Sequence, residues 1–190
     1  MSGDSLPPSV RALKNAGQQV WLDDLSRGLV RSGGLHRAIE EWGVTGVTSN
    51  PAIVARAVCG NPDYDASIGR CRGRGMDTEA IALELAVEDV AGAADLLRST
   101  WVATDGGDGW VSIQLPPRLA DDEVASVEAA LALHERVGRP NVLIKMPATT
   151  AGLRAIEEVV VQGVPVTVTL LLTPAHAAQS AEAYVRAIER

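Results

Sequence analysis

The stretch NVLIKMPATTAGLRAIEEVVVQGVPVTVTLLLTP (141–174) decides the fold. Its first part, 141–148, and its last apolar part, 164–172, are short runs rich in branched apolar residues, as in strands that are buried on both faces. The segment between them, 149–163, repeats its apolar residues at spacings of three and four, which indicates a helix. A strand, a helix and a second strand in this order predict a βαβ unit with parallel strands.

The same alternation continues outward from this unit. The remaining strands are expected in QQVWLDD (18–24), GVTS (46–49) and WVSIQLP (110–116). The expected helices are a stretch through LHRAIEEWG (35–43), NPAIVARAV (50–58), a long region over roughly 61–104, a helix through SVEAALALHERVG (126–138) that Asp121 or Asp122 caps and Gly138 ends, and a last helix from Pro174. Five strands alternating with helices predict an α/β fold with a parallel sheet covered by helices.

Two architectures show this alternation, the open doubly wound sheet and the (β/α)8 barrel. No glycine-rich phosphate-binding motif follows the first strand, which weakens the dinucleotide-binding alternative. Residues 1–190 contain no linker, low-complexity tract or short repeat, so we expect a single α/β domain.

The composition indicates a globular protein of the reducing cytoplasm. With 46% hydrophobic and 22% charged residues, the chain lies far from the disordered class. The net charge of −7 argues against nucleic acid and a basic membrane-binding patch, but leaves anionic substrates open. Cys59 and Cys71 have no metal-ligand spacing, and a disulfide framework is not expected. We expect neither a secretory signal in 1–17 nor a transmembrane helix.

Each expected strand carries a polar residue at or just beyond its carboxyl end. They are Asp23, Asn50, Gln114, Lys145 and Thr169. Because parallel α/β folds gather their chemistry at this end of the strands, these residues form the candidate site.

Lys145 is the least expected of the five, because Ile144 and Met146 flank it. Its amine either reaches solvent past the strand end or is buried. Burial would lower the pKa of the amine and make it a nucleophile suited to imine formation with a carbonyl.

Three of the others also allow both a structural and a chemical interpretation. Asp23 is either a proton-transfer carboxylate or a helix N-cap, and Asp24 competes for either role. Asn50 is either an N-cap or an amide that orients a sugar hydroxyl. Gln114 binds water or substrate, or satisfies a loop carbonyl.

The remaining polar residues favour structural interpretations. Thr167 and Thr169 share one face of a strand, where β-branched residues usually serve packing. The acidic helices are expected to be solvated. A metal site is not expected, since the histidines lie singly on expected helices: His36, His134 and His176.

Specific strings resemble the transaldolase family, in the manner of its long bacterial members. They are VWLDDLSR (20–27), GVTSNPAI (46–53), VSIQLPPRLADD (111–122), NVLIKMPATTAGLRAIEE (141–158) and VTVTLLLT (166–173). The resemblance covers nearly the whole chain and keeps the family's order of elements. It implies an incomplete (β/α)8 barrel of about five βα units, and class I aldolase chemistry without metal or organic cofactor.

By this resemblance, Lys145 forms an imine with C2 of a ketose phosphate such as fructose 6-phosphate or sedoheptulose 7-phosphate. Asp23 takes the C4 hydroxyl proton as the C3–C4 bond breaks, and the dihydroxyacetone unit passes to an aldose phosphate, as in the pentose phosphate pathway. Gln114 and Thr169 hold the water that shuttles protons during imine formation. The substrate-binding residues implied are Asn50, which binds hydroxyls of the three-carbon unit, and Thr48, Ser49 and Thr167.

Three departures from the family bear on activity. Gln114 stands where transaldolases usually carry Glu; a neutral amide orients water but cannot accept its proton. The related fructose-6-phosphate aldolases do carry Gln there. Thr167 stands where Asn is common. The chain stops after the helix that follows the fifth strand, before the sixth strand, whose serine and arginine bind the substrate phosphate in the family.

We therefore expect that the chain is truncated at its C-terminus from a longer parent. A partner chain or second copy that closes the sheet, and an inactive remnant, are the alternatives. Two functions follow: Schiff-base chemistry on sugar phosphates, as carbon transfer or as simple aldol cleavage, and a catalytically impaired binding or interaction module descended from a transaldolase.

Overall fold

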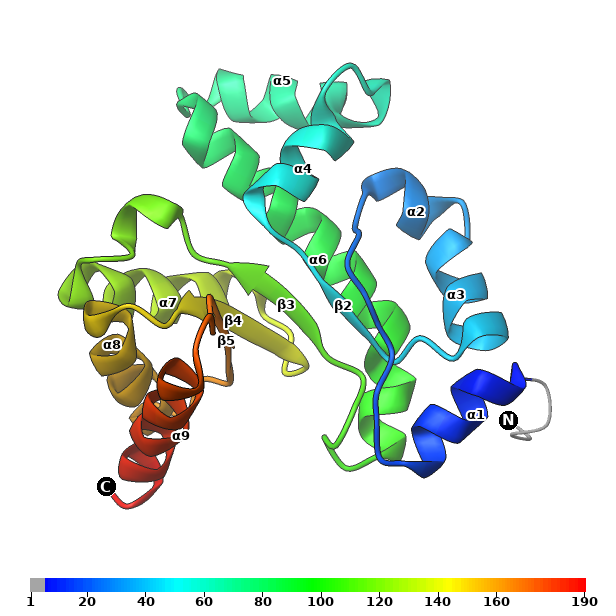
Figure 1. Cartoon of the computed structure of the whole chain (residues 1–190). Coiled ribbons are helices and arrows are strands. Elements are labelled where there is room, and N and C mark those ends of the chain that lie inside the picture. Colours follow the sequence, from blue (N-terminus) through cyan, green and yellow to red (C-terminus); the bar gives the residue numbers. More distant parts are fainter. Residues whose placement is uncertain (1–5) are drawn as a thin grey trace. The chain divides into compact units, whose positions relative to one another are not determined.

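The computed structural model describes residues 6–190, and its five strands form one sheet in chain order, β1-β2-β3-β4-β5. The strands are β1 Trp21–Leu22, β2 Gly46–Thr48, β3 Val111–Gln114, β4 Val142–Pro147 and β5 Val166–Thr169 (Figure 1). A doubly wound sheet reverses its strand order at a switch point, whereas a (β/α)8 barrel adds each strand beside the last. The chain-order sheet is therefore of the barrel type, with five strands described.

Helices precede the first strand, connect the successive strands and follow the last one. They are α1 Pro8–Asn15, α2 Arg27–Arg31, α3 Gly34–Trp42, α4 Pro51–Val58, the 3₁₀ turn η2 Pro62–Tyr64, α5 Asp65–Gly73, α6 Thr78–Ala103, the 3₁₀ turn η3 Pro117–Leu119, α7 Glu123–Val137, α8 Thr150–Val161 and α9 Pro174–Ile188. Over the described part of the chain, no helix is long and apolar enough to cross a membrane. The chain divides into two compact units, one of residues up to Val111 with Arg139–Asn141, the other of Ser112–Gly138 with Val142–Arg190.

The first unit is built around the long helix α6. This helix contacts α2, α3, α4 and α5 (Figure 1), and its buried apolar residues include Val90, Ala93, Ala94 and Leu97. Strands β1 and β2 pair in parallel, with Trp21 opposite Gly46 and Leu22 opposite Val47. Glycine is required at 46, because a Cβ there would lie 2.3 Å from the Trp21 ring.

In the second unit, helices α7 and α8 both contact β4. The side chains of β4 alternate between the fully buried Val142, Ile144 and Met146 and the half-buried Leu143, Lys145 and Pro147. Gly152 allows α8 to begin close to β4, because a Cβ there would lie 2.1 Å from the Pro147 carbonyl oxygen. The helices account for the buried face of β4, and Lys145 lies on the opposite face.

The expected helical region 61–104 is divided into α5 and α6, because Gly75 takes a left-handed φ of 74° after α5, and the Asp77 side chain then caps α6. The expected end of the last strand is wrong. Strand β5 ends at Thr169 instead of 172, because Leu170 has a φ of 64°, which cannot continue a strand.

The boundaries of α7 agree with the sequence pattern, whereas those of β1 do not. Asp122, and not Asp121, caps α7 by accepting a hydrogen bond from the Ala125 N–H, and Gly138 ends this helix with a φ of 60°. Strand β1 is shorter than expected, with paired residues only at Trp21–Leu22.

Candidate active site

Gln114, Lys145 and Thr167 lie in one row across three neighbouring strands of the second unit. Lys145 is directly opposite Thr167 in the parallel pairing of β4 with β5. The Leu115 N–H donates to the Lys145 carbonyl at 3.1 Å. In a parallel ladder this bond sets Gln114 level with Lys145. Paired residues point to the same face, so the three half-buried side chains share it.

Thr169 lies two residues further along β5, on the same face as Thr167. It is opposite Pro147, and its carbonyl accepts a hydrogen bond from the Ala148 N–H at 2.9 Å. Thr169 is therefore one row closer to the carboxyl end of the sheet than Lys145. A hydroxyl in this position lies between the amine and the loops where a substrate would enter.

Lys145 is half-buried, so its side chain is neither fully exposed nor enclosed in the core. Its strand neighbours Ile144 and Met146 are fully buried and fix the direction of the side chain. The chain contains one other lysine, Lys14, which is exposed in the last turn of α1. Lys145 is thus the one lysine that a strand carries.

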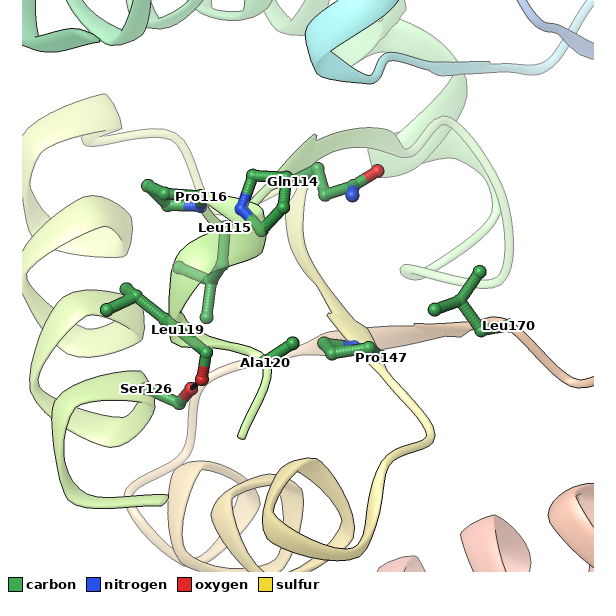
Figure 2. Close-up of a pocket in the computed structure, with 9 residues that line it drawn as sticks. Gln114, Leu115, Pro116, Leu119, Ala120, Ser126, Pro147 and Leu170 are labelled. Carbon is green, nitrogen blue, oxygen red and sulfur yellow. Dashed lines mark hydrogen bonds between the residues drawn. The ribbon is translucent and has the colours of Figure 1, made fainter. Parts of the chain in front are cut away.

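A hollow lies beside Gln114 at the carboxyl ends of β3 and β4 (Figure 2). Its lining is mostly apolar: Gln114, Leu115, Pro116, Pro117, Leu119, Ala120, Ser126, Pro147 and Leu170. The Ser126 hydroxyl is already bound, since it donates to the Leu119 carbonyl at 2.7 Å (Figure 2). Within residues 6–190, the Gln114 amide makes no side-chain hydrogen bond. Its donors and acceptor are available to water or a ligand in the hollow.

The other candidate residues belong to the first unit, where they follow β1 and β2. Since Leu22 is opposite Val47, the register brings Asp23 level with Thr48. Asp23 is exposed, Thr48 is half-buried, and Ser49 is 2% exposed. These side chains lie at the carboxyl ends of two paired parallel strands, which is where the sequence predicts them.

Asn50 caps helix α4 through one end of its amide. Its Oδ1 accepts a hydrogen bond from the Ile53 N–H at 3.0 Å. In the described part of the chain, its Nδ2 group makes no hydrogen bond. The structural and the chemical interpretation of Asn50 are therefore compatible, because the cap fixes the amide and leaves two N–H donors.

Asp23 is not a helix cap. The cap of α2 is Ser26, whose hydroxyl accepts a hydrogen bond from the Leu29 N–H at 3.1 Å. Asp23 and Asp24 are both exposed, and their carboxylates make no hydrogen bond or ion pair with the residues that the structure describes. Either carboxylate is open to a ligand.

A buried ionic group in the first unit was not foreseen from the sequence. We call it the Arg27 cluster: Arg27, Tyr64, Ser67, Glu88 and Asp89. Arg27 is 5% exposed, and its guanidinium binds Asp89 at 3.0 Å, Glu88 at 2.7 Å and the Ser67 hydroxyl at 2.8 Å. Asp89 is 8% exposed, so the expectation of a solvated acidic face is wrong for this part of α6.

Burial acts on both carboxylates of the Arg27 cluster, with different results. It raises the pKa of Asp89, despite the hydrogen bonds that this carboxylate accepts. Burial acts in the same direction on Glu88, but hydrogen bonds from Ser67 and Arg70 outweigh it and hold the pKa of Glu88 below its usual value. A buried Arg, Tyr and Asp far apart in sequence have no periodic signal, so only the fold reveals the cluster.

No group of three or more His, Cys, Asp or Glu side chains within residues 6–190 could hold a metal ion. The model of the family described as transaldolase/fructose-6-phosphate aldolase matches residues 20–188. The chain belongs to this family. The match includes all the candidate residues of this transaldolase-family chain, from Asp23 to Thr169.

Curated relatives of the transaldolase-family chain agree with this assignment. A protein named transaldolase from Mycobacterium ulcerans is 42% identical over 186 residues, which are 98% of this chain and 50% of that protein. A protein named transaldolase 2 from a Nostoc species is 40% identical over 178 residues, which are 94% of this chain and 47% of that protein. The chain spans about half the length of the curated relatives it matches.

Proposed function

We propose that the chain carries the Schiff-base half of a transaldolase-type site, which transfers a dihydroxyacetone unit between sugar phosphates. The observation that supports this most directly is the row of Gln114, Lys145 and Thr167, which sets an amine between an amide and a hydroxyl at the carboxyl end of the sheet. Such a row supplies a nucleophile with polar groups on both sides.

The first step is imine formation at Lys145. Its neutral amine attacks the C2 carbonyl of a ketose phosphate such as fructose 6-phosphate or sedoheptulose 7-phosphate, and the carbinolamine loses water. Gln114 and Thr169 orient the water that carries protons in this step. Because the Gln114 amide cannot accept a proton, it acts here as a donor and acceptor of hydrogen bonds only.

The second step is cleavage of the C3–C4 bond. The exposed carboxylate of Asp23 takes the proton of the C4 hydroxyl, the bond breaks, and its electrons move into the imine to form an enamine. The aldose phosphate leaves. Asn50, through its Nδ2 donors, holds hydroxyls of the three-carbon unit, with Thr48, Ser49 and Thr167 as further binding groups. The enamine carbon then attacks the carbonyl carbon of an acceptor aldose phosphate, and hydrolysis of the resulting imine releases the new ketose phosphate and frees the Lys145 amine.

A simpler reaction is the second candidate. Gln114 is the residue that the related fructose-6-phosphate aldolases carry, and it favours protonation of the enamine and release of free dihydroxyacetone. The chemistry of both candidates needs no metal or organic cofactor. A third candidate, a catalytically impaired binding module, is favoured by Gln114 together with Thr167.

We also propose that residues 1–190 form one barrel domain of a cytoplasmic protein. A (β/α)8 barrel has eight strands, and five are described. Further βα units from a longer parent protein, or from a partner chain such as a second copy, would close the sheet beside β5. The location is supported by the two free thiols, Cys59 and Cys71.

The deciding experiment is borohydride trapping with fructose 6-phosphate, read by intact mass and peptide mapping. Because Lys14 and Lys145 are the lysines of the chain, the map distinguishes two sites. We expect an adduct on Lys145 that the Lys14→Arg variant keeps and the Lys145→Arg variant loses. Folded protein that gives no adduct at Lys145 contradicts the proposed chemistry and favours the binding module.

A further inference from the structure

We propose that Arg27 is a positioning residue that holds the Asp23 carboxylate in place for bond cleavage. The inference rests on the proposed function, in which Asp23 removes the C4 hydroxyl proton. It concerns residues of the first unit alone. Arg27 itself is buried and does not contact a substrate.

Asp23 needs such a device because nothing else in the described residues holds its carboxylate. The side chain is exposed and makes no hydrogen bond or ion pair. Its position therefore depends on the backbone of the loop 23–26. This loop starts at Leu22, which is fixed by its pairing with Val47 in β2.

The far end of the loop is fixed by the Arg27 cluster. The backbone N–H of Arg27 donates to the Tyr64 hydroxyl at 2.8 Å, and that hydroxyl donates to Asp89 at 2.7 Å. The Arg27 guanidinium lies 4.4 Å from the centre of the Tyr64 ring. The backbone and the side chain of Arg27 thus both bind the same buried pair, Tyr64 of η2 and Asp89 of α6.

Each of the three guanidinium nitrogens of Arg27 has a bonding partner. Nε binds Asp89, Nη2 binds Glu88, and Nη1 binds the Ser67 hydroxyl and the Asp63 carbonyl. The planar guanidinium, bound through each of its three nitrogens, fixes orientation as well as distance, which a lysine at 27 could not reproduce. The start of α2, and with it the loop that ends there, has one well-defined position.

This arrangement assigns Arg27 to one step of the reaction. Imine formation uses Lys145 and does not need Asp23, so it should proceed when the loop moves. Cleavage needs the Asp23 carboxylate within hydrogen-bond distance of the C4 hydroxyl. Displacement by about 1 Å can lower such a step roughly 100-fold.

Trapping distinguishes the two steps by mass. The intact chain is incubated with fructose 6-phosphate and reduced with borohydride at timed intervals. An uncleaved imine leaves a six-carbon phosphate adduct on Lys145, and a cleaved one leaves a three-carbon adduct. For Arg27→Met we expect wild-type formation of total adduct, with the three-carbon adduct formed roughly 100-fold more slowly.

Two further variants keep the test decisive. Tyr64→Phe retains the ring and removes the hydroxyl that binds the Arg27 N–H. It should also slow formation of the three-carbon adduct, so it provides the test if Arg27→Met does not fold. Arg70→Met removes a 61% exposed arginine that shares Glu88 but does not touch the loop, and it should behave as wild type.

The outcomes are separable. Wild-type proportions of the two adducts in folded Arg27→Met and Tyr64→Phe overturn the positioning role and leave the proposed function intact. No adduct from wild-type protein overturns the proposed function, and the role of Arg27 with it.

Discussion

Thr167 lies directly opposite Lys145 in the parallel pairing of β5 with β4. Paired side chains on one face have Cβ atoms about 5 Å apart. The amide of an asparagine side chain at 167 would therefore reach a hydroxyl of a sugar bound at Lys145. The threonine side chain is shorter than that of asparagine.

We predict that Thr167→Asn strengthens substrate capture. One added hydrogen bond contributes about 1 kcal/mol, so half-maximal trapping on Lys145 should need roughly fivefold less fructose 6-phosphate. The measurement is adduct yield against sugar concentration. Thr167→Val, which keeps the branched shape, is the control and should not gain. Equal curves for Asn and Thr would show that position 167 does not contact the sugar.

A second prediction concerns Gln114, which is level with Lys145 on the other side. Gln114→Glu introduces a carboxylate that can accept a proton from the shuttling water. General acid–base catalysis contributes roughly 100-fold or more, and the rate of imine trapping should rise accordingly. The rise should appear as the pH increases through the titration of the new carboxyl, since only its ionised form is a base. Gln114→Met should slow trapping. A rate that is the same with Gln and Glu would refute the proton-relay argument.

Asn50 offers a variant that separates its two roles. Asn50→Asp keeps an oxygen for the Ile53 N–H but has no amide donor. It should keep the stability of the protein and lose substrate capture. Asn50→Ala should lose both, with about 1 kcal/mol less stability from the missing cap. Urea denaturation and borohydride trapping on the same samples test this, and an Asp variant that traps as well as wild type would assign Asn50 to capping alone.

The fold was largely predictable because its signals are local. The apolar runs around Lys145 and the helical spacing after it identify a βαβ unit, and both are confirmed by β4, α8 and β5. The strand order was not predictable from periodicity, since barrels and doubly wound sheets share the same alternation. The end of β5 also depends on the positive φ of Leu170, which the sequence pattern does not predict.

The candidate site was predictable only in part, for a related reason. Polar residues at strand ends stand out against apolar runs, and Lys145 was found this way. The Arg27 cluster joins residues from α2, η2, α5 and α6, whose contacts exist only in the folded chain. Asp89 looks like any acidic helix residue until its 8% exposure is known.

The Arg27 cluster leads to a prediction about stability. Arg27→Met leaves Asp89 as a buried charge without its cation, and such a change costs about 3–5 kcal/mol. Arg70→Met removes a salt bridge to the same Glu88, but Arg70 is 61% exposed, so the cost should stay below about 1 kcal/mol. Urea denaturation of the two variants should therefore differ strongly. Similar midpoints would mean that the cluster contributes little to stability.

The last prediction concerns alkaline pH. Tyr64 is fully buried, and burial, together with the neighbouring Asp89, raises its pKa from 10.0 to about 12, although the Arg27 N–H acts in the opposite direction. The unfolded chain releases the phenol proton near pH 10, and the folded chain holds it until about 12. The contribution of the protonated Tyr64 phenol to the free energy of unfolding is therefore complete below pH 10 and is lost as the pH rises to about 12.

A difference of about two pKa units corresponds to roughly 3 kcal/mol. The free energy of unfolding, measured by urea denaturation, should fall by this order between pH 10 and 12 for wild type. Tyr64→Phe has no proton to lose at this position, so its smaller stability should change less over the same interval. Tyrosinate absorbance gives an independent measure, because Tyr184 is 50% exposed and Tyr64 is enclosed. If Tyr64 titrates below pH 11 in folded protein, burial and Asp89 do not raise its pKa as the structure indicates.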